Sequence, residues 1–72
     1  MERRTFSLDG SEYIELIGLL KYMGLAENGA QAKELVMSGQ VVRDGVIELR
    51  KRAKLRVGDS IVVGQVTVVV VS

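Results

Sequence analysis

The sequence predicts an α+β domain, in which an N-terminal strand and two short packed helices precede a small, mainly antiparallel sheet. Apolar residues recur at helical spacing in the first half of the chain and follow extended patterns in the second half. Glycines stand where both predicted helices should end, and turn dipeptides stand between the predicted strands. Seventy-two residues suffice for one domain with a modest core, so we expect a single domain over residues 1–72.

The chain should begin with a short strand and a first helix. Residues 4–8 alternate, with Phe6 and Leu8 on one face. A turn follows, from which Asp9 or Ser11 could cap the first helix. The apolar stripe of this helix comprises Tyr13, Leu16, Ile17, Leu20 and Met23.

Glycines mark the ends of both predicted helices. Gly24 fits the left-handed residue that stops the first helix, and Gly39 ends the second. Asn28 can cap the second helix, with Gln31 at capping-box spacing. The connection between the helices is short, so they should pack against each other at an angle.

After the second helix the pattern becomes extended and predicts two hairpins. The expected pairs are residues 41–43 with 46–48, turned by Asp44-Gly45, and residues 60–63 with 66–71, turned by Gly64-Gln65. The valine-rich end should be a buried strand rather than a surface for a partner strand, because an exposed apolar edge promotes aggregation.

Composition argues against most catalytic and metal sites. The chain has no cysteine, which excludes a disulfide or a thiolate site, and no histidine, the usual general base. We therefore expect a protein that is not an enzyme and uses no cofactor. A monomer is the expected oligomeric state. Residues 61–71 form the longest apolar stretch, which is too short to span a membrane. No apolar signal core follows the N-terminus, so a cytoplasmic location is expected.

Positive charge is concentrated in the middle of the chain. Residues 33–56 hold seven basic and three acidic residues, although the whole chain has a net charge of only +1. Residues 50–56, the basic segment, contain no acidic residue. If the basic segment is extended, cations project from one face and small apolar residues from the other. The cationic face would comprise Arg50, Arg52, Lys54 and Arg56, and the apolar face Leu49, Ala53 and Leu55, with Lys51 as the exception.

A row of cations without an internal partner favours binding to a polyanion. The alternative is a solvated, charged connection, which is a common role for such runs. The start of the second helix could extend the surface, because helix N-termini bind phosphate groups. Gly29 would allow a ligand to approach closely and Lys33 lies one turn further on, although simple capping by Asn28 is the weightier interpretation. Few aromatic residues are present, which argues against recognition of single strands by stacking.

Several segments together resemble a known RNA-binding domain. They are residues 19–41, Asp44-Gly45, residues 48–52 and Gly58-Asp59. In this order they are similar to the domain first known from small-subunit ribosomal protein S4, which is also appended to pseudouridine synthases and bacterial tyrosyl-tRNA synthetases. The resemblance covers about residues 14–63 and is strongest to short bacterial proteins of the YbcJ-like type.

This resemblance implies an αL motif, in which two packed helices precede a hairpin and RNA lies along the second helix and adjoining loops. Two residues depart from the family: Gly29 stands where many members have arginine, and Arg43 where valine is common. Arg43 would either point outward and join the cationic surface, or mark a shift at the end of its strand. The resemblance assigns RNA contacts to Asn28, Gly29, Gln31, Lys33, Arg50, Lys51, Arg52 and Lys54, and the charge pattern adds Arg43 and Arg56.

The leading prediction is therefore a non-catalytic module that binds structured RNA, either ribosomal or transfer RNA, through phosphate contacts and shape. Association with the ribosome is a further expectation. The alternative is a protein-interaction adaptor associated with the ribosome or with an RNA-processing enzyme.

Overall fold

Two strands, two helices and five further strands follow one another along the chain in the computed structural model, which describes residues 2–72. Met1, the first residue of the predicted single domain, lies outside the described residues. The elements are β1 (Glu2–Ser7), β2 (Ile14–Glu15), α1 (Leu16–Tyr22), α2 (Gly29–Met37), β3 (Val41–Arg43), β4 (Val46–Ile47), β5 (Lys54–Leu55), β6 (Ser60–Val63) and β7 (Val66–Val71).

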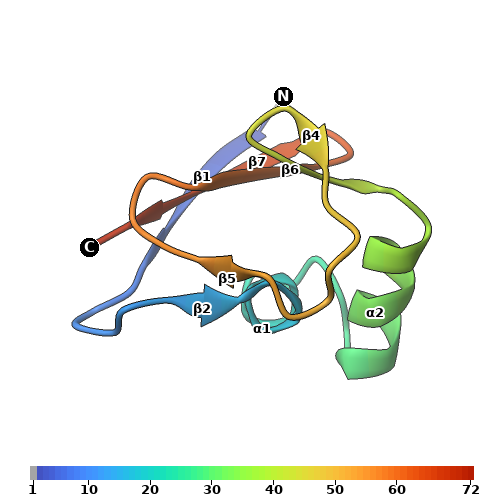
Figure 1. Cartoon of the computed structure of the whole chain (residues 1–72), viewed down its shortest axis with the longest axis horizontal. Coiled ribbons are helices and arrows are strands. Elements are labelled where there is room, and N and C mark those ends of the chain that lie inside the picture. Colours follow the sequence, from blue (N-terminus) through green and yellow to red (C-terminus); the bar gives the residue numbers. More distant parts are fainter. Residues whose placement is uncertain (1) are drawn as a thin grey trace.

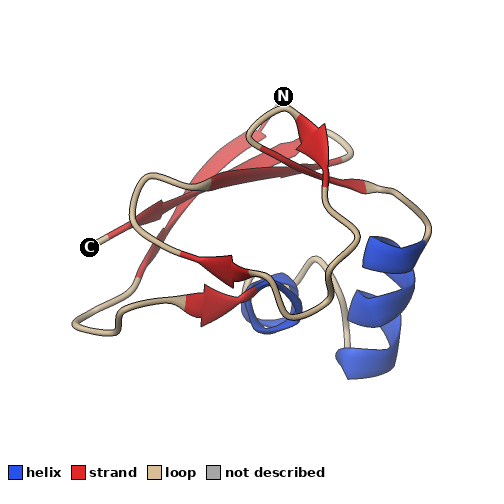
Figure 2. Ribbon diagram, viewed as in Figure 1, coloured by secondary structure: helices blue, strands red, loops and turns tan. Residues whose placement is uncertain are grey.

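The strands form one main sheet and one small ribbon. The main sheet has the order β1-β7-β6-β3-β4, and only the pairing of β1 with β7 is parallel. The ribbon joins β2 and β5 in antiparallel fashion. The main sheet makes one layer, and the helices and the ribbon make the other (Figures 1 and 2). The predicted α+β class with a mainly antiparallel sheet is confirmed.

The core fills the space between the two layers. α1 and α2 pack against each other, as expected for helices joined by a short connection. The sheet contributes branched side chains from its central strands, including those of the valine-rich β7. Fully buried side chains of the core include Leu16, Leu19, Leu20, Val36, Val41, Leu55, Ile61, Val68 and Val70. The prediction that the C-terminal strand is buried is confirmed.

Both helices end at the predicted glycines. Gly24 has a φ of 74°, and the N–H of Leu25 donates to the carbonyl of Leu20 at 2.9 Å. This is the six-to-one hydrogen bond of a Schellman ending. Gly39, with a φ of 78°, closes α2 in the same manner. Both residues adopt a backbone conformation that is strained for any residue with a Cβ atom.

The predicted start of the first helix is wrong. Asp9 lies in a turn with a φ of 50°, and α1 begins only at Leu16, with no side-chain cap. The N–H groups of Leu16 and Ile17 instead donate to the carbonyls of Ala53 and Lys51, at 2.9 and 3.2 Å. Backbone oxygens of the basic segment therefore satisfy the first turn of α1, and this distant partner leaves no capping signal near the helix.

Both predicted hairpins are present. Asp44 and Gly45 have φ values of 49° and 87°, as a type I′ turn requires, and Gly64 opens the second turn with a φ of 60°. β6 and β7 have the predicted bounds, whereas β4 ends one residue early, at Ile47. Within residues 2–72, no helix is long and apolar enough to cross a membrane.

Candidate nucleic-acid interface

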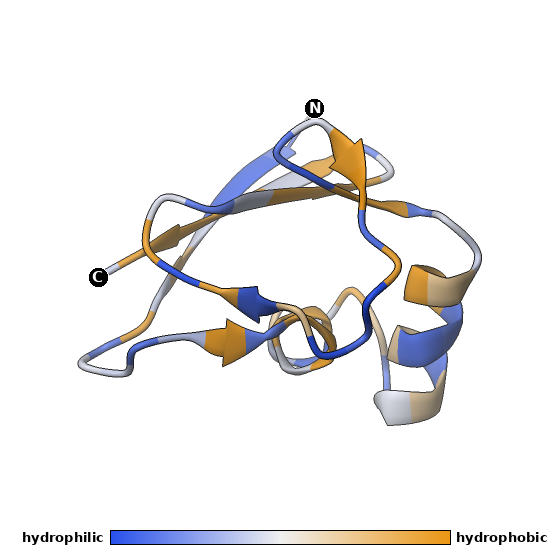
Figure 3. Cartoon of the chain, viewed as in Figure 1, coloured by the Kyte–Doolittle hydropathy of each residue, from blue (hydrophilic) through white to orange (hydrophobic). Residues whose placement is uncertain are grey.

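The basic segment is not one extended strand. Its first residues form a turn, closed by the N–H of Ala53 donating to the carbonyl of Arg50 at 3.2 Å, and only β5 is extended. Ala53 and Leu55 are buried as predicted, but Leu49 is exposed. The prediction of a single straight row of cations is therefore wrong. Figure 3 shows the hydrophilic turn between the apolar β4 and the ribbon.

A buried carboxylate fixes Arg50 in place. Arg50 Nε lies 3.0 Å from Glu48 Oε2, and Nη2 lies 3.1 Å from Oε1. The backbone N–H of Arg50 also donates to Oε2, at 3.1 Å. The side-chain hydrogen bonds from Arg50 are the largest cause of a lowered pKa of Glu48, which falls to about 2. Burial of the carboxylate raises this pKa, but by less. The expectation that the cations lack internal partners is wrong for Arg50.

Arg43 points inward rather than toward solvent. Its Nη2 lies 2.9 Å from Asp59 Oδ2 and 3.1 Å from the carbonyl oxygen of Lys54. Its Nη1 lies 3.3 Å from Glu48 Oε1. The strand is not shifted, because Arg43 pairs with Val46 across the hairpin as a two-residue turn requires. Arg43 therefore joins β3 to β5 and to the turn before β6, and it is not a free cation.

Two further cations lie over an aromatic ring on the ribbon. Lys54 Nζ is 5.0 Å, and Arg56 Cζ is 5.5 Å, from the ring centroid of Tyr13. Tyr13 was predicted to lie on the apolar face of the first helix, but it precedes that helix and is 37% exposed. Because α1 starts late, Tyr13 falls just before β2, where Lys54 of β5 and Arg56, one residue after β5, lie over its ring. Tyr22 is exposed and meets Phe6 edge-on, with ring centroids 4.9 Å apart.

The exposed cations without partners are the ones best placed to bind an anion. Lys51 and Arg52 are exposed, and neither side chain makes a hydrogen bond or ion pair with another described residue. Lys33 on α2 is exposed in the same way, and so are Arg3 and Lys21 outside the predicted site. Lys51 and Arg52 differ from the latter two because they belong to the turn that caps α1.

Two hollows adjoin the turn of residues 50–53, the basic turn. The first, of about 490 Å³, is lined by Arg43, Arg50, Arg52, Ala53 and Lys54. The second, of about 440 Å³, is lined by Arg43, Asp44, Val46, Ile47, Glu48 and Arg50. Four cations surround the first hollow, whereas the second combines apolar and charged walls. Arg43 and Arg50 belong to both hollows and separate them.

At the start of α2, the predicted residues mainly shape the helix. Asn28 Oδ1 accepts a hydrogen bond from the N–H of Gln31 at 2.8 Å, which confirms the cap. The Gln31 side chain accepts from the N–H of Glu27 rather than completing a capping box on Asn28. A Cβ atom added at Gly29 would meet nothing within 4 Å. The helix reaches the basic turn through α1, which packs on α2 and is capped by that turn.

Comparison with known proteins identifies the family. A family model described as the S4 domain matches residues 6–71, nearly the whole chain. The chain belongs to the S4 domain family. All ten predicted contact residues lie inside the matched S4 domain, as do both hollows. No group of three or more His, Cys, Asp or Glu side chains able to hold a metal ion occurs in the described part of this S4 domain.

Relatives of this S4 domain are known from enterobacteria. The YbcJ proteins of Escherichia coli K12 and Shigella flexneri are each 47% identical to it over 57 residues, which cover 79% of this chain and 81% of theirs. The solution structure of YbcJ from E. coli matches with a TM-score of 0.73 and 44% identity, over 94% of this chain and 86% of that one. That structure is described as revealing an αL motif involved in RNA binding.

Proposed function

We propose that this S4 domain binds structured RNA, ribosomal or transfer RNA, through phosphate contacts and shape, without catalysis. The observation that carries the proposal is the basic turn, where Lys51 and Arg52 are exposed and unpaired beside a hollow lined by four cations. The description of E. coli YbcJ as containing an αL motif involved in RNA binding supports the same function. The S4 domain would act as a monomer in the cytoplasm, where it would associate with the ribosome if its target is ribosomal RNA.

The residues of the site divide into contact and positioning roles. Lys33, Lys51 and Arg52 have cationic groups free to neutralise phosphates. Arg43 ties the residues on either side of the basic turn to β3, through Glu48 and the carbonyl of Lys54, and Asn28 fixes the start of α2. Because the turn is anchored at both ends, the backbone positions of Lys51 and Arg52 are fixed, which suits recognition of a folded backbone by shape. Gly29, Gln31, Arg50, Lys54 and Arg56 complete the proposed surface.

RNA binding measured across a salt series tests this function. The native chain should bind structured ribosomal or transfer RNA more tightly than single-stranded RNA or duplex DNA of equal length. If it neutralises about five phosphates, the slope of log affinity against log salt should lie near −3.5 to −4.5. A flat salt response, or equal affinity for all four nucleic acids, would contradict the proposal.

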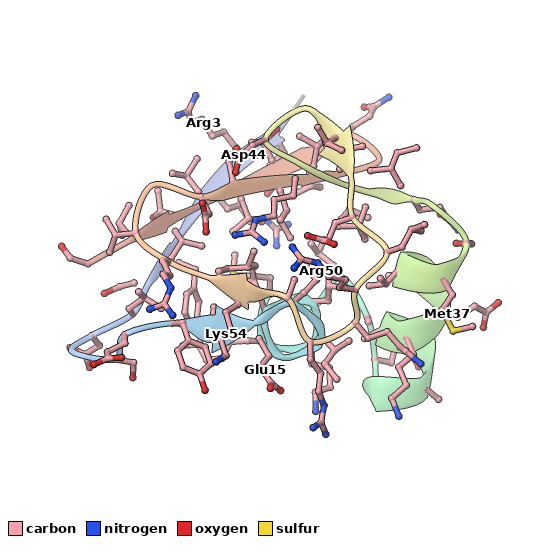
Figure 4. All side chains as sticks on the ribbon, viewed as in Figure 1. Arg3, Glu15, Met37, Asp44, Arg50 and Lys54 are labelled. Atoms are coloured by element: carbon pink, nitrogen blue, oxygen red, sulfur yellow. The ribbon has the colours of Figure 1, made fainter. Side chains whose placement is uncertain are left out.

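A pair of matched variants locates the contact surface. Lys51→Ala with Arg52→Ala removes two cations from the basic turn, and Arg3→Ala with Lys21→Ala removes two that lie elsewhere. None of the four side chains has a partner among the described residues, so both variants should fold. Figure 4 shows Arg3 above the main sheet and Lys54 below it, on the ribbon, in this view. The variant without Lys51 and Arg52 should bind RNA more weakly, and its slope of log affinity against log salt should be less steep by about 1.4 to 1.8. The variant without Arg3 and Lys21 should change both affinity and slope less. Equal effects would mean that net charge alone governs binding.

A protein-interaction adaptor is the second candidate. Several large apolar side chains are exposed around the first hairpin and the end of α2, and clusters of that kind commonly mark protein contacts. They are Met37, Val46, Ile47 and Leu49. An adaptor would bind its partner protein unchanged after loss of Lys51 and Arg52, which separates it from the RNA-binding function.

A further inference from the structure

The second hollow differs in chemistry from the first, although the two adjoin. Its walls combine the exposed apolar side chains of Val46 and Ile47 with the guanidinium groups of Arg43 and Arg50. A phosphate gains nothing from apolar walls, so this hollow suits a ligand that has both an apolar face and polar edges. An unpaired nucleobase has that character.

Arg50 presents a flat surface at the boundary between the hollows. An arginine side chain has five N–H donors, and two of those of Arg50 donate to Glu48, one to each carboxylate oxygen. This paired contact fixes the guanidinium plane, yet 74% of the Arg50 side chain remains exposed. Figure 4 shows Arg50 between the main sheet and β5 in this view. Guanidinium planes stack on nucleobases, so Arg50 can serve where the chain lacks an aromatic platform.

We propose that the second hollow binds one unpaired base of the RNA, stacked on the guanidinium of Arg50 and packed against Ile47. The phosphate next to this base then lies in the first hollow, where Arg52 and Lys54 face it. This inference rests on the proposed RNA-binding function and adds a requirement for an unpaired nucleotide, in a loop or a bulge, beside the helical region.

The charges favour a base in the second hollow and a phosphate in the first. Asp44 and Glu48 offset the two arginines of the second hollow, whereas the first hollow is lined by four cations and no acidic residue, so an anion is attracted more strongly to the first. Each oxygen of Glu48 already accepts two hydrogen bonds from arginine N–H groups. Three side-chain N–H groups of Arg50 remain available to a base or a phosphate oxygen.

Two RNA stems with equal numbers of phosphates test the inference. One is fully paired and the other carries a single unpaired nucleotide, replaced by 2-aminopurine for a fluorescence measurement. The chain has no tryptophan, so the fluorescence of 2-aminopurine is observed without interference. The native chain should bind the stem with the unpaired nucleotide at least about tenfold more tightly, and the fluorescence should change on binding, because base stacking contributes strongly to affinity.

Two variants assign the preference to the second hollow. Ile47→Thr removes apolar surface from an exposed side chain, and Arg50→Lys keeps the charge but removes the plane. Ile47→Thr should lose the preference for the unpaired nucleotide while binding the fully paired stem with the native salt dependence. Arg50→Lys should lose the same preference. Arg3→Lys, the matched control for Arg50→Lys, should keep the preference. Circular dichroism checks that each variant is folded.

The outcomes separate this inference from the function on which it rests. Equal binding of both stems by the native chain overturns the base site and leaves RNA binding intact. Failure to bind either stem overturns the proposed function itself. A preference that survives in folded Ile47→Thr also overturns the inference, and the exposed apolar wall would then be open to a protein partner.

Discussion

Glu48 and Arg50, two residues apart in the sequence, form a paired contact in which both carboxylate oxygens accept from the guanidinium, at 3.0 and 3.1 Å. The carboxylate is almost buried, whereas the arginine side chain is mostly exposed. Glu48 also accepts a hydrogen bond from Arg43, so one acidic residue connects β3 with the start of the basic turn. Glu48 therefore ties the start of the basic turn to the main sheet.

The first prediction concerns pH. The pKa of Glu48 falls from 4.5 to about 2 on folding, so its ionised form is favoured by the folded state. This contribution to the free energy of unfolding is fully present above about pH 4.5 and is lost as the pH falls toward 2. Glu48→Gln should lower stability by roughly 1–3 kcal/mol at neutral pH and bring it closer to the native value near pH 2. Urea unfolding of both proteins across this pH range measures the difference, and parallel pH curves would contradict it.

The second prediction separates a positioning arginine from a contact arginine. Arg43→Ala leaves Asp59 and Glu48 with fewer partners in a mostly buried network, so it should destabilise the fold by about 2–4 kcal/mol. Arg52→Ala removes an exposed, unpaired cation and should change stability by less than about 0.5 kcal/mol. RNA affinity should show the opposite order once both proteins are folded. Thermal unfolding and binding assays test the pair, and a strong stability loss in Arg52→Ala would place that side chain in the network.

The third prediction concerns the ring beneath two cations. Tyr13→Leu removes the cation–π contacts with Lys54 and Arg56 and should lower stability by about 0.5–1 kcal/mol. Tyr13→Phe retains the ring and should remain near the native value. Denaturant unfolding in low and high salt compares the two variants. If Phe and Leu are equally destabilising, the hydroxyl group rather than the ring is what matters.

Local signals predicted the parts of the fold that depend on neighbouring residues. Gly24, Gly39 and the Asp44-Gly45 turn act over a few positions, and each was assigned correctly from the sequence. The start of α1 was not, because its first N–H groups bond to the carbonyls of Lys51 and Ala53, more than thirty residues away. No pattern near Leu16 indicates that partner.

The same distinction holds for the candidate site. The sequence located the cations of the basic segment and the small apolar residues that anchor it, because both depend on composition and alternation. It could not show that Arg43 turns inward, because Asp59, its nearest partner, is brought to it by the pairing of β3 with β6. The spacing of Glu48 and Arg50 could have indicated their contact, since alternate residues of an extended chain lie on one face.

The last prediction adds a contact that this chain lacks. Gly29 is the first residue of α2, and its φ is not positive. A Cβ atom there meets nothing within 4 Å, so Gly29→Arg should fold and gain up to about 1 kcal/mol, since glycine is unfavourable in helices. The added cation lies at the N-terminal end of α2, where backbone N–H groups already favour phosphate. Affinity for structured RNA should rise and the salt slope should become more negative by about 0.7 to 0.9.

Gly29→Ala is the matched control, because it should reproduce the gain in stability without any change in the slope. If Gly29→Arg alters stability alone, the RNA does not reach the start of α2, and binding is confined to the basic turn.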